Sequence, residues 1–325
     1  YTPTSLADGD KVTVVVISSA SCPGPNATSN EITMNVNPNL PVSVSISEDQ
    51  NSICEGTEVT FTATPTNGGS NPVYQWKVNG TNVGTNSPTF STTTLQDNDI
   101  VTVVLTSNAT CAVDNPATSN PITMEVNPNL PVSVSIAEDL NSVCDGTAVT
   151  FTATPTNGGS SPSYQWKVNG VDVGTDSPTF TSTTLSDNDV VTVVMTSDET
   201  CTSGNPATSN PVTMEIYPNL PVSVSIAEDL NSICDGTAVT FTATPTNGGS
   251  SPSYQWYVNG TTPVGTDSPT FTSTTLSDND VVTVVMTSSE TCTTDNPSTS
   301  NGITMTVNPI LPVSVSIDAD NNPVC

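Results

Sequence analysis

Apolar and polar residues alternate with a period of two, in short runs, along the whole chain. In the run 164–168 (YQWKV), this alternation places Tyr164, Trp166 and Val168 on one face of a strand and two polar side chains on the other. The dipeptide Asn169-Gly170 follows and supplies the positive backbone angles of a tight hairpin turn. No run shows the 3.6-residue period of a helix. The pattern therefore predicts an all-β chain built from short strands.

The same run recurs every 90 residues, centred on Trp76, Trp166 and Trp256. A period of this length indicates one small domain per repeat and not one turn of a solenoid. A lone indole on a half-buried strand suits the core of such a domain, so we expect all three to be buried. The sequence predicts complete repeats at 39–128, 129–218 and 219–309, the C-terminal part of a repeat at 1–38 and the N-terminal part of another at 310–325. Neither partial repeat could bury a core alone, so we expect the parent protein to extend beyond both ends.

Turn signals divide the middle repeat into about seven short strands, which is typical of a β-sandwich. We predict the first strand at 131–136, with a short continuation at 141–144, and further strands at 148–154, 163–169 with the return arm 171–173, 179–185, 189–196 and 211–216. The predicted core consists of Val149, Phe151, Tyr164, Trp166, Leu185, Val191, Val193 and Met214. Nearly every position of 190–195 is apolar, so alternation alone does not decide which of its side chains face inward.

The charge balance excludes several classes of function. The chain has 31 Asp and Glu against 3 Lys and Arg, a net charge of −28 and no His. Such a charge repels phosphate backbones and anionic membrane surfaces, which excludes nucleic-acid binding. No apolar run is long enough to span a bilayer. Without His, catalytic triads and most proton-transfer pairs are unavailable, so we predict no catalytic residues and no enzymatic activity.

Four short motifs of the middle repeat resemble those of a known family. They are Cys144-Asp145-Gly146, Tyr164-Gln165-Trp166, Asp187-Asn188-Asp189-Val190 and Cys201 followed by Ser209-Asn210. Over effectively its whole length, the chain resembles the PKD-like and immunoglobulin-like (Ig-like) repeat arrays of large cell-surface adhesins secreted by gliding Bacteroidota. The resemblance implies tandem Ig-like β-sandwiches outside the cell, forming adhesin fibres or spacers in secreted enzymes. The cysteines of antibody domains are absent, because Phe151 and Val193 lie in those strands.

The linkers between repeats are short and rich in proline. Residues 36–41 (VNPNLP) join one repeat to the next, and residues 127–131 do the same one repeat later. Proline fixes backbone angles, so we expect stiff joints and an elongated, fairly straight rod. In the alternative, Asn-Pro-Asn forms a turn that folds the next strand back onto the preceding domain.

Eight cysteines without His or a Cys-X-X-Cys motif indicate an exported disulfide framework and not a zinc site. In an Ig-like sandwich, the turn before 148–154 and the loop after 189–196 lie at opposite ends. About eight residues at ~3.3 Å each separate them by ~25 Å, whereas a disulfide needs Cα atoms within ~7 Å. A bond from Cys144 to Cys201 is therefore strained. In a head-to-tail array, a staggered scheme pairs Cys54 with Cys201 and Cys144 with Cys292.

Two other disulfide schemes stay open. Local pairing joins neighbouring cysteines of one repeat, as disulfides often do: Cys54–Cys111, Cys144–Cys201 and Cys234–Cys292. Consecutive pairing requires the folded-back linker: Cys22–Cys54, Cys111–Cys144, Cys201–Cys234 and Cys292–Cys325.

Acidic side chains cluster in two turns at one end of each repeat. In the middle repeat these are Glu138-Asp139 and the turn containing Asp187 and Asp189. Oxygen ligands from two loops suit Ca²⁺, the one cofactor that the sequence suggests. In the alternative, these side chains close their turns through hydrogen bonds to the backbone.

Near-identical repeats in series add length and not new sites. The sequence therefore predicts the structural stalk of an extracellular cell-surface adhesin fibre, whose surface or glycan ligand binds a tip outside this segment. The alternative is a spacer or weak carbohydrate-binding module of a secreted polysaccharide-degrading enzyme. Glycan binding usually needs exposed aromatic side chains, and the chief candidates outside the core are Tyr217 and Tyr257. Lateral self-association into a filament is a further possibility that the sequence leaves open.

Overall fold

The alternating runs form β-strands throughout the part of the chain that the structure describes. The structure is a computed structural model that describes residues 2 and 5–317. Strands are the only regular elements among these residues, and no helix occurs. The chain divides into two compact units, Tyr1–Val132 with Asp198–Asn205, and Ser133–Ser197 with Pro206–Cys325. Each is described below by itself.

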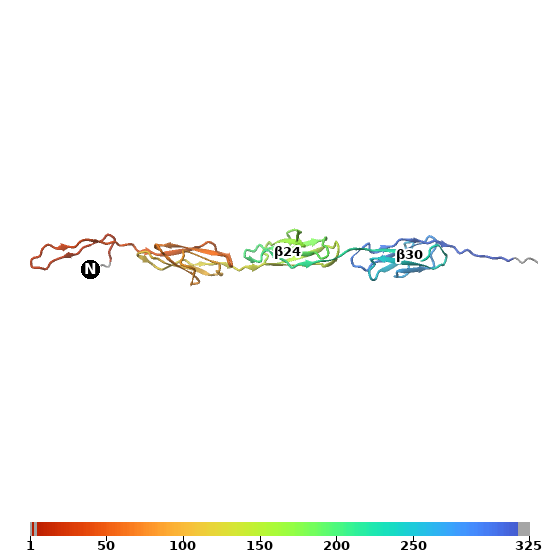
Figure 1. The fold of residues 1–325 in the computed structure, drawn as a ribbon, viewed down its shortest axis with the longest axis horizontal. Helices are drawn as coiled ribbons and strands as arrows, with labels where there is room; N and C mark the ends of the chain where they lie inside the picture. Colours follow the sequence, from red (N-terminus) through yellow and green to blue (C-terminus); the bar gives the residue numbers. More distant parts are fainter. Residues whose placement is uncertain (1, 3–4, 318–325) are drawn as a thin grey trace, which may run out of the picture. The chain divides into compact units, whose positions relative to one another are not determined.

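The second repeat folds into two antiparallel sheets that face each other. One sheet has the order β18–β20–β23, and the other has the order β22–β21–β24–β26, with β27 also paired to β24. The strands are β18 (Ser133–Glu138), β20 (Val149–Thr156), β21 (Ser163–Val168), β22 (Val171–Val173), β23 (Thr179–Ser182), β24 (Val190–Thr196), β26 (Ala207–Thr208) and β27 (Val212–Thr213). This arrangement, with β24 labelled in Figure 1, is an Ig-like sandwich.

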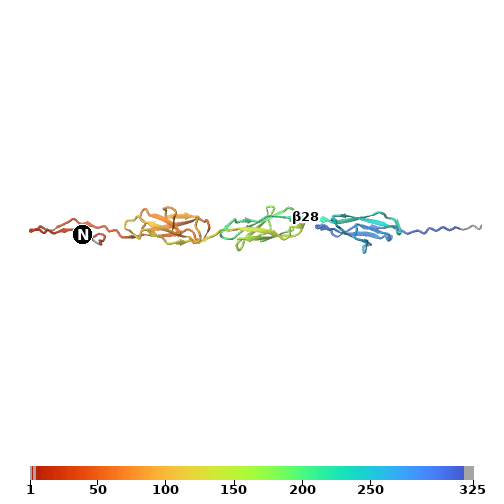
Figure 2. The ribbon, with the colours of Figure 1, turned by 90° about the horizontal axis from the view of Figure 1, so that it is seen from below.

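The other two complete repeats have the same topology (Figure 1 and Figure 2). In the first, the strands are β6 (Ser43–Glu48), β8 (Val59–Thr66), β9 (Val73–Val78), β10 (Thr81–Val83), β11 (Thr89–Thr92), β12 (Ile100–Thr106), β14 (Ala117–Thr118) and β15 (Ile122–Thr123). In the third, they are β30 (Ser223–Glu228), β32 (Val239–Thr246), β33 (Ser253–Val258), β34 (Thr262–Val264), β35 (Thr270–Ser273), β36 (Val281–Thr287), β38 (Ser298–Thr299) and β39 (Ile303–Thr304). The predicted fold class, all-β with tandem Ig-like sandwiches, is confirmed. The domain boundaries and the elongated rod stay predictions.

Each core is centred on the repeated tryptophan. Trp76, Trp166 and Trp256 have no exposed surface. The ring of Trp166 lies 6.3 Å from that of Phe151 and 5.7 Å from that of Phe180. Its Nε1–H donates a 2.9 Å hydrogen bond to the Ser177 carbonyl, so the indole brings no unpaired polar group into the core.

The remaining predicted core residues are buried as well, and the structure resolves the ambiguous run. All eight residues predicted for the core of the middle repeat are buried. Along β24, Val191, Val193 and Met195 are fully buried, while the residues between them are half-buried. The inward face therefore includes Met195, which the sequence pattern did not single out.

Most predicted strands of the middle repeat are shifted by one or two residues in the structure, and two differ more. The strand predicted at 179–185 ends at Ser182, because the Ser182 hydroxyl accepts a hydrogen bond from the Thr184 amide and the chain turns. The strand predicted at 211–216 is divided at Met214 into β27 and β28 (Glu215–Tyr217). The Met214 amide donates a hydrogen bond to the Asp189 carbonyl, and the Met214 carbonyl accepts one from the Asn188 amide, so this residue is held by the neighbouring turn.

The regions before the first repeat and after the third are more open. Residues 11–33 form two short antiparallel ladders, β1 (Lys11–Val12) with β4 (Ile32–Thr33) and β2 (Val15–Val16) with β3 (Ala27–Thr28). Val14 and Val16 there are 60% and 61% exposed. Residues 310–317 form no strand, and Val313, Val315 and Ile317 are more than 90% exposed.

We predict that Trp166→Ala lowers the unfolding free energy of the second repeat by about 3–5 kcal/mol, because it leaves a large cavity at a fully buried site. Denaturant titration monitored by hydrogen exchange in that repeat measures the effect. Val171→Ala is the matched control, since Val171 is 67% exposed and its truncation should change the stability by under about 0.5 kcal/mol. Equal effects of the two substitutions would contradict the central role of the indole.

Candidate functional site at the linkers

In the first unit, the linker backbone is hydrogen-bonded on two sides. Its first part, β16 (Val126–Asn127), pairs in parallel with β7 (Ile53–Cys54). Its second part, β17 (Leu130–Pro131), pairs in parallel with β25 (Thr202–Ser203). Four backbone bonds hold it: Ile53 N–H to Glu125 O, Glu55 N–H to Asn127 O, Leu130 N–H to Cys201 O and Val132 N–H to Ser203 O, each 2.9 Å.

The second unit repeats this arrangement one linker later. Here β28 pairs in parallel with β19 (Ser142–Cys144), and β29 (Leu220–Pro221) pairs with β37 (Thr293–Thr294). Figure 2 labels β28 at this linker. The backbone bonds are Asp145 N–H to Tyr217 O at 2.9 Å, Leu220 N–H to Cys292 O at 2.9 Å and Val222 N–H to Thr294 O at 3.0 Å.

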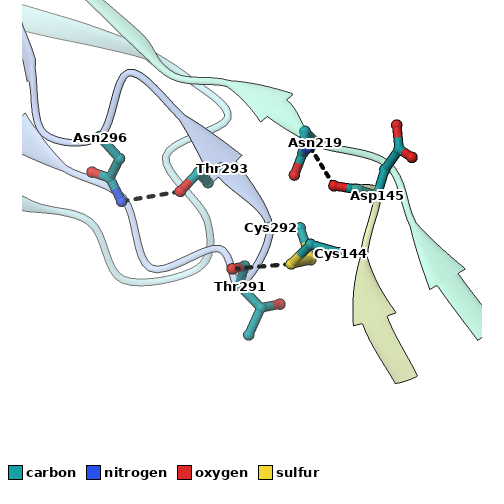
Figure 3. Close-up of a disulfide and its surroundings, with 7 residues drawn as sticks. All are labelled: Cys144, Asp145, Asn219, Thr291, Cys292, Thr293 and Asn296. Carbon is teal, nitrogen blue, oxygen red and sulfur yellow. Dashed lines mark hydrogen bonds between the residues drawn. A yellow bond between two sulfur atoms is a disulfide. The ribbon is translucent and has the colours of Figure 1, made fainter. Parts of the chain in front are cut away.

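A disulfide joins the two flanks of each of these two linkers. Cys54 bonds Cys201, and Cys144 bonds Cys292, with Cα–Cα distances of 5.4 Å in both. Figure 3 shows the second bond beside Asn219, whose Nδ2 donates a 3.0 Å hydrogen bond to the Asp145 carbonyl. Asn129 makes the same bond to Glu55 in the first unit. We call the linker, its two flanking strands and the disulfide between them the linker clamp.

These bonds are the two pairs of the staggered scheme. The local pairs Cys54–Cys111, Cys144–Cys201 and Cys234–Cys292 are wrong, because Cys54, Cys144 and Cys292 each bond a cysteine of another repeat. The consecutive scheme is wrong as well, because each of its pairs needs a cysteine that is bonded to a different partner: Cys54, Cys144, Cys201 or Cys292. Cys325 itself lies outside the described residues. The physical cause is that the two cysteines of one repeat lie at opposite ends of the sandwich, whereas cysteines of successive repeats meet at a linker.

Proline lacks a backbone N–H, and the linker tolerates it because its nitrogen faces away from the paired strand. Alternate amides of a strand point to opposite sides, and the Leu130 and Val132 amides both point to β25. The nitrogen of Pro131 lies between them and would point away from β25. Proline therefore stiffens the linker without removing a hydrogen bond from the ladder.

The acidic turns are closed by their own side chains. Asp139 accepts a hydrogen bond from the Thr150 amide at 2.8 Å, and Asp187 accepts one from the Ile216 amide at 3.1 Å. The remaining bonds are Ser186 N–H and Asn169 Nδ2–H to Asp189, at 2.8 and 2.7 Å, and Asn141 Nδ2–H to Glu138, at 2.8 Å. Among the described residues, no three acidic, Cys or His side chains gather as a metal site would require. Hydrogen bonds that close the turns account for these carboxylates. Ca²⁺ binding stays a hypothesis.

A small hydrogen-bonded cluster beside the second linker was not predicted. The Ser142 hydroxyl and the Tyr217 hydroxyl both donate hydrogen bonds to the Glu215 carboxylate. These bonds lower the pKa of Glu215, and the bond to Glu215 raises the pKa of Tyr217. Only the parallel pairing of β19 with β28 brings the three together, so sequence spacing carried no signal. Tyr217, expected outside the core, is 45% exposed.

A shallow groove recurs on the second and third repeats. It has a volume of about 440 Å³ in the second repeat, where Val173, Phe180 and Leu185 line it together with Thr and Ser side chains. The equivalent groove of the third repeat has a volume of about 520 Å³. No Trp or Tyr lines either groove, and Tyr257 lies half-buried on β33 outside them.

Comparisons with known proteins add no family. No family model matches the chain, and no curated protein matches it. Among solved structures, the three N-terminal domains of the Hoc protein of bacteriophage RB49 align with a TM-score of 0.31 at 15% identity, over 83% of this chain and 100% of that one. The FN1–FN3 domains of chicken CNTN1 give 0.23 at 14% identity, over 82% and 98%. The eight N-terminal Ig domains of Down Syndrome Cell Adhesion Molecule give 0.23 at 11%, over 94% and 45%.

At these TM-scores the alignments carry no functional argument, and the Ig-like assignment stands on the sheet topology described above. The described residues also contain no helix that is long and apolar enough to cross a membrane.

We predict that replacing both Cys144 and Cys292 by Ser lowers the unfolding free energy by about 2–4 kcal/mol, because the bond restricts the unfolded chain. Denaturant titration measures this loss. Cys234→Ser is the control and should have no effect, since Cys234 is exposed and unbonded. An unreduced digest in which Cys144 is linked to Cys201 would show that the clamp is not formed.

For calcium, we predict the same unfolding midpoint in chelator and in millimolar Ca²⁺, because the turn carboxylates are already hydrogen-bonded to amides. Calorimetry under the two conditions tests this. A midpoint raised by Ca²⁺, and lost in Asp187→Asn, would restore the metal hypothesis.

Proposed function

We propose that this chain is a structural stalk segment of an extracellular cell-surface adhesin fibre. The linker clamp carries the proposal. Ordinary linkers between Ig-like domains are flexible points, because few contacts cross them. Here the linker has hydrogen-bonded strands on both sides and a covalent bond between those flanks. Such a joint suits a protein that must transmit tension.

The clamp gives tension two paths past each linker. One path runs through the linker backbone. The other runs through the disulfide, from Cys144 directly to Cys292 in the second unit. The short ladders alone would contribute only about 0.5–1.5 kcal/mol for each hydrogen bond. The disulfide therefore keeps the two flanks together when tension separates the short ladders.

The disulfides and the net charge support the proposed cellular compartment and partners. Disulfides persist in oxidising surroundings, which supports a location outside the cell. The net charge of −28 makes copies repel one another along their sides, which opposes lateral bundling. We propose that the ligand, a surface or a glycan, is bound by a tip outside this segment and that the segment itself is not an enzyme.

One observation favours a second candidate, a spacer or weak carbohydrate-binding module of a secreted polysaccharide-degrading enzyme. The recurring groove lined by Thr and Ser side chains could receive hydroxyl groups of a sugar. It lacks the exposed aromatic ring on which sugar rings usually stack. Specific binding of the full chain on a glycan array, abolished by Phe180→Ala, would favour this candidate over the stalk.

We predict that intact disulfides shorten the stretched chain by roughly 600 Å, at about 3.3–3.6 Å per residue. In the fully stretched oxidised protein, force passes through the first disulfide from Cys54 to Cys201. It then runs back along the chain to Cys144 and through the second disulfide to Cys292. Residues 55–143 and 202–291 then carry no force. Single-molecule stretching with and without reductant measures the difference in contour length.

Equal contour lengths with and without reductant would sink the stalk model, since the clamps would not be bearing load. The variant in which Cys54 and Cys144 are both Ser is the matched control. It should give the long contour length in either condition.

A further inference from the structure

The two linker clamps are built on the same plan, but their disulfides are not equally accessible. In the first clamp, Cys54 and Cys201 are both half-buried. In the second clamp, Cys144 is half-buried and Cys292 is only 6% exposed. A thiol reduces a disulfide by direct attack of its thiolate on one of the two sulfur atoms, so the rate depends on access to that sulfur. The two bonds therefore differ in a property that controls their reduction.

A groove lies beside the first disulfide. It has a volume of about 350 Å³, and Cys54 and Cys201 form part of its wall. This volume falls within the range of small-molecule sites, roughly 300–1,000 Å³. The wall contains no charged side chain that would repel a thiolate, since its other residues are Gln50, Ser52, Ile53, Thr57, Asn127 and Thr200. The groove thus gives a small thiol a route to the sulfur atoms.

At the second disulfide, a tyrosine takes the place of the asparagine that lines this groove. Cys54 pairs with Asn127 in the parallel ladder of β7 and β16, and Cys144 pairs with Tyr217 in the ladder of β19 and β28. Residues that pair directly across a ladder project their side chains to the same face. Tyr217 therefore lies on the same face as the Cys144 sulfur.

The Tyr217 ring is held in this position by the hydrogen-bonded cluster beside the second linker. Its hydroxyl donates a 2.7 Å hydrogen bond to Glu215, and the Ser142 hydroxyl donates a second one to the same carboxylate. The ladder beneath the ring has three residue pairs, whereas the corresponding ladder of the first clamp has two. Tyr217 is 45% exposed, so more than half of its surface is covered by its neighbours.

On this face of the ladder, the tyrosine alone distinguishes the second clamp from the first. The first clamp has Ser52 and Glu125 where the second has Ser142 and Glu215. The hydroxyl and the carboxylate are therefore present at both, and a difference in charge between these faces does not account for the difference in exposure. The aromatic ring is what remains.

We propose that the groove of the first clamp is a site for a low-molecular-weight thiol of the cysteine or glutathione class. The thiol enters the groove and opens Cys54–Cys201, while Tyr217 shields Cys144–Cys292. Reduction leaves the first linker held by hydrogen bonds alone, so that this joint responds to reducing surroundings and the second does not. The consequence for load rests on the proposed stalk function, whereas the difference in reduction does not.

The reduction consumes two molecules of the thiol. The first thiolate attacks one sulfur of the Cys54–Cys201 bond, which forms a mixed disulfide and releases the other cysteine as a thiolate. A second thiolate attacks the sulfur of the small molecule in that mixed disulfide and releases the second cysteine. One protein disulfide is reduced to two thiols, two small thiols are oxidised to one disulfide, and their two protons pass to the released cysteine thiolates.

The test measures the reduction of both bonds in one folded chain. To remove thiols that could attack the disulfides from within, the full chain carries four substitutions: Cys22→Ser, Cys111→Ser, Cys234→Ser and Cys325→Ser. The oxidised protein is incubated with reduced glutathione without denaturant or load, new thiols are alkylated, and mass spectrometry of the peptides gives the rate for each bond.

We expect Cys54 and Cys201 to be alkylated at least about tenfold faster than Cys144 and Cys292, at a rate proportional to the glutathione concentration. Equal rates, or faster reduction of the second bond, would overturn the proposal. A rate independent of glutathione would also overturn it, because unfolding and not access would then be limiting. If the rates are equal but reductant still lengthens the stretched chain, the stalk proposal stands and this inference fails.

Reciprocal substitutions test the role of the ring. Tyr217→Asn should bring the reduction of the second bond close to that of the first, and Asn127→Tyr should slow the first at least about threefold. Tyr217→Phe is the matched control, which keeps the ring and should keep most of the protection. Because protection gained in Asn127→Tyr cannot result from lost structure, that variant decides the question even if Tyr217→Asn is unstable. Unchanged rates in both exchanges would refute the shielding.

Discussion

The length of one sandwich decides how this chain is cross-linked. The cysteine before the second strand of a repeat and the cysteine after its sixth strand lie at opposite ends of the same domain, roughly 25 Å apart by strand length. A disulfide cannot span that distance. The four bonded cysteines therefore pair between neighbouring repeats, as Cys144 bonds Cys292. Each disulfide therefore links two neighbouring repeats at their linker and does not cross-link a single domain.

In each unit, backbone pairing holds the linker on both sides. A linker of a few residues pairs in parallel first with one repeat and then with the next, so its amides are satisfied on both sides. The prolines fit because their nitrogens fall at positions where the ladder needs no donor. Asn219 adds a side-chain bond across the same joint. The disulfide closes an arrangement that the hydrogen bonds have already aligned.

In the described repeats, aromatic and acidic side chains serve structural contacts. Their aromatic rings stack in the cores, and their acidic side chains close turns. The second linker carries a hydrogen-bonded cluster of Glu215, Ser142 and Tyr217, which the first linker lacks because Asn127 stands in place of the tyrosine. The two linker clamps are the feature on which the proposal of a stalk rests.

The sequence by itself determined the class of fold, because a period of two within strands and a period of 90 along the chain both follow from local residue order. It also determined the core: Val149, Phe151 and Trp166 could be identified by alternation alone. It did not determine which face of Val190–Thr196 points inward, where every residue but the threonines is apolar, nor which cysteines pair. The tertiary structure decided both, because each depends on what lies across space. The facing sheet selects the buried side of a uniformly apolar strand, and only the meeting of two repeats at a linker brings Cys54 to Cys201.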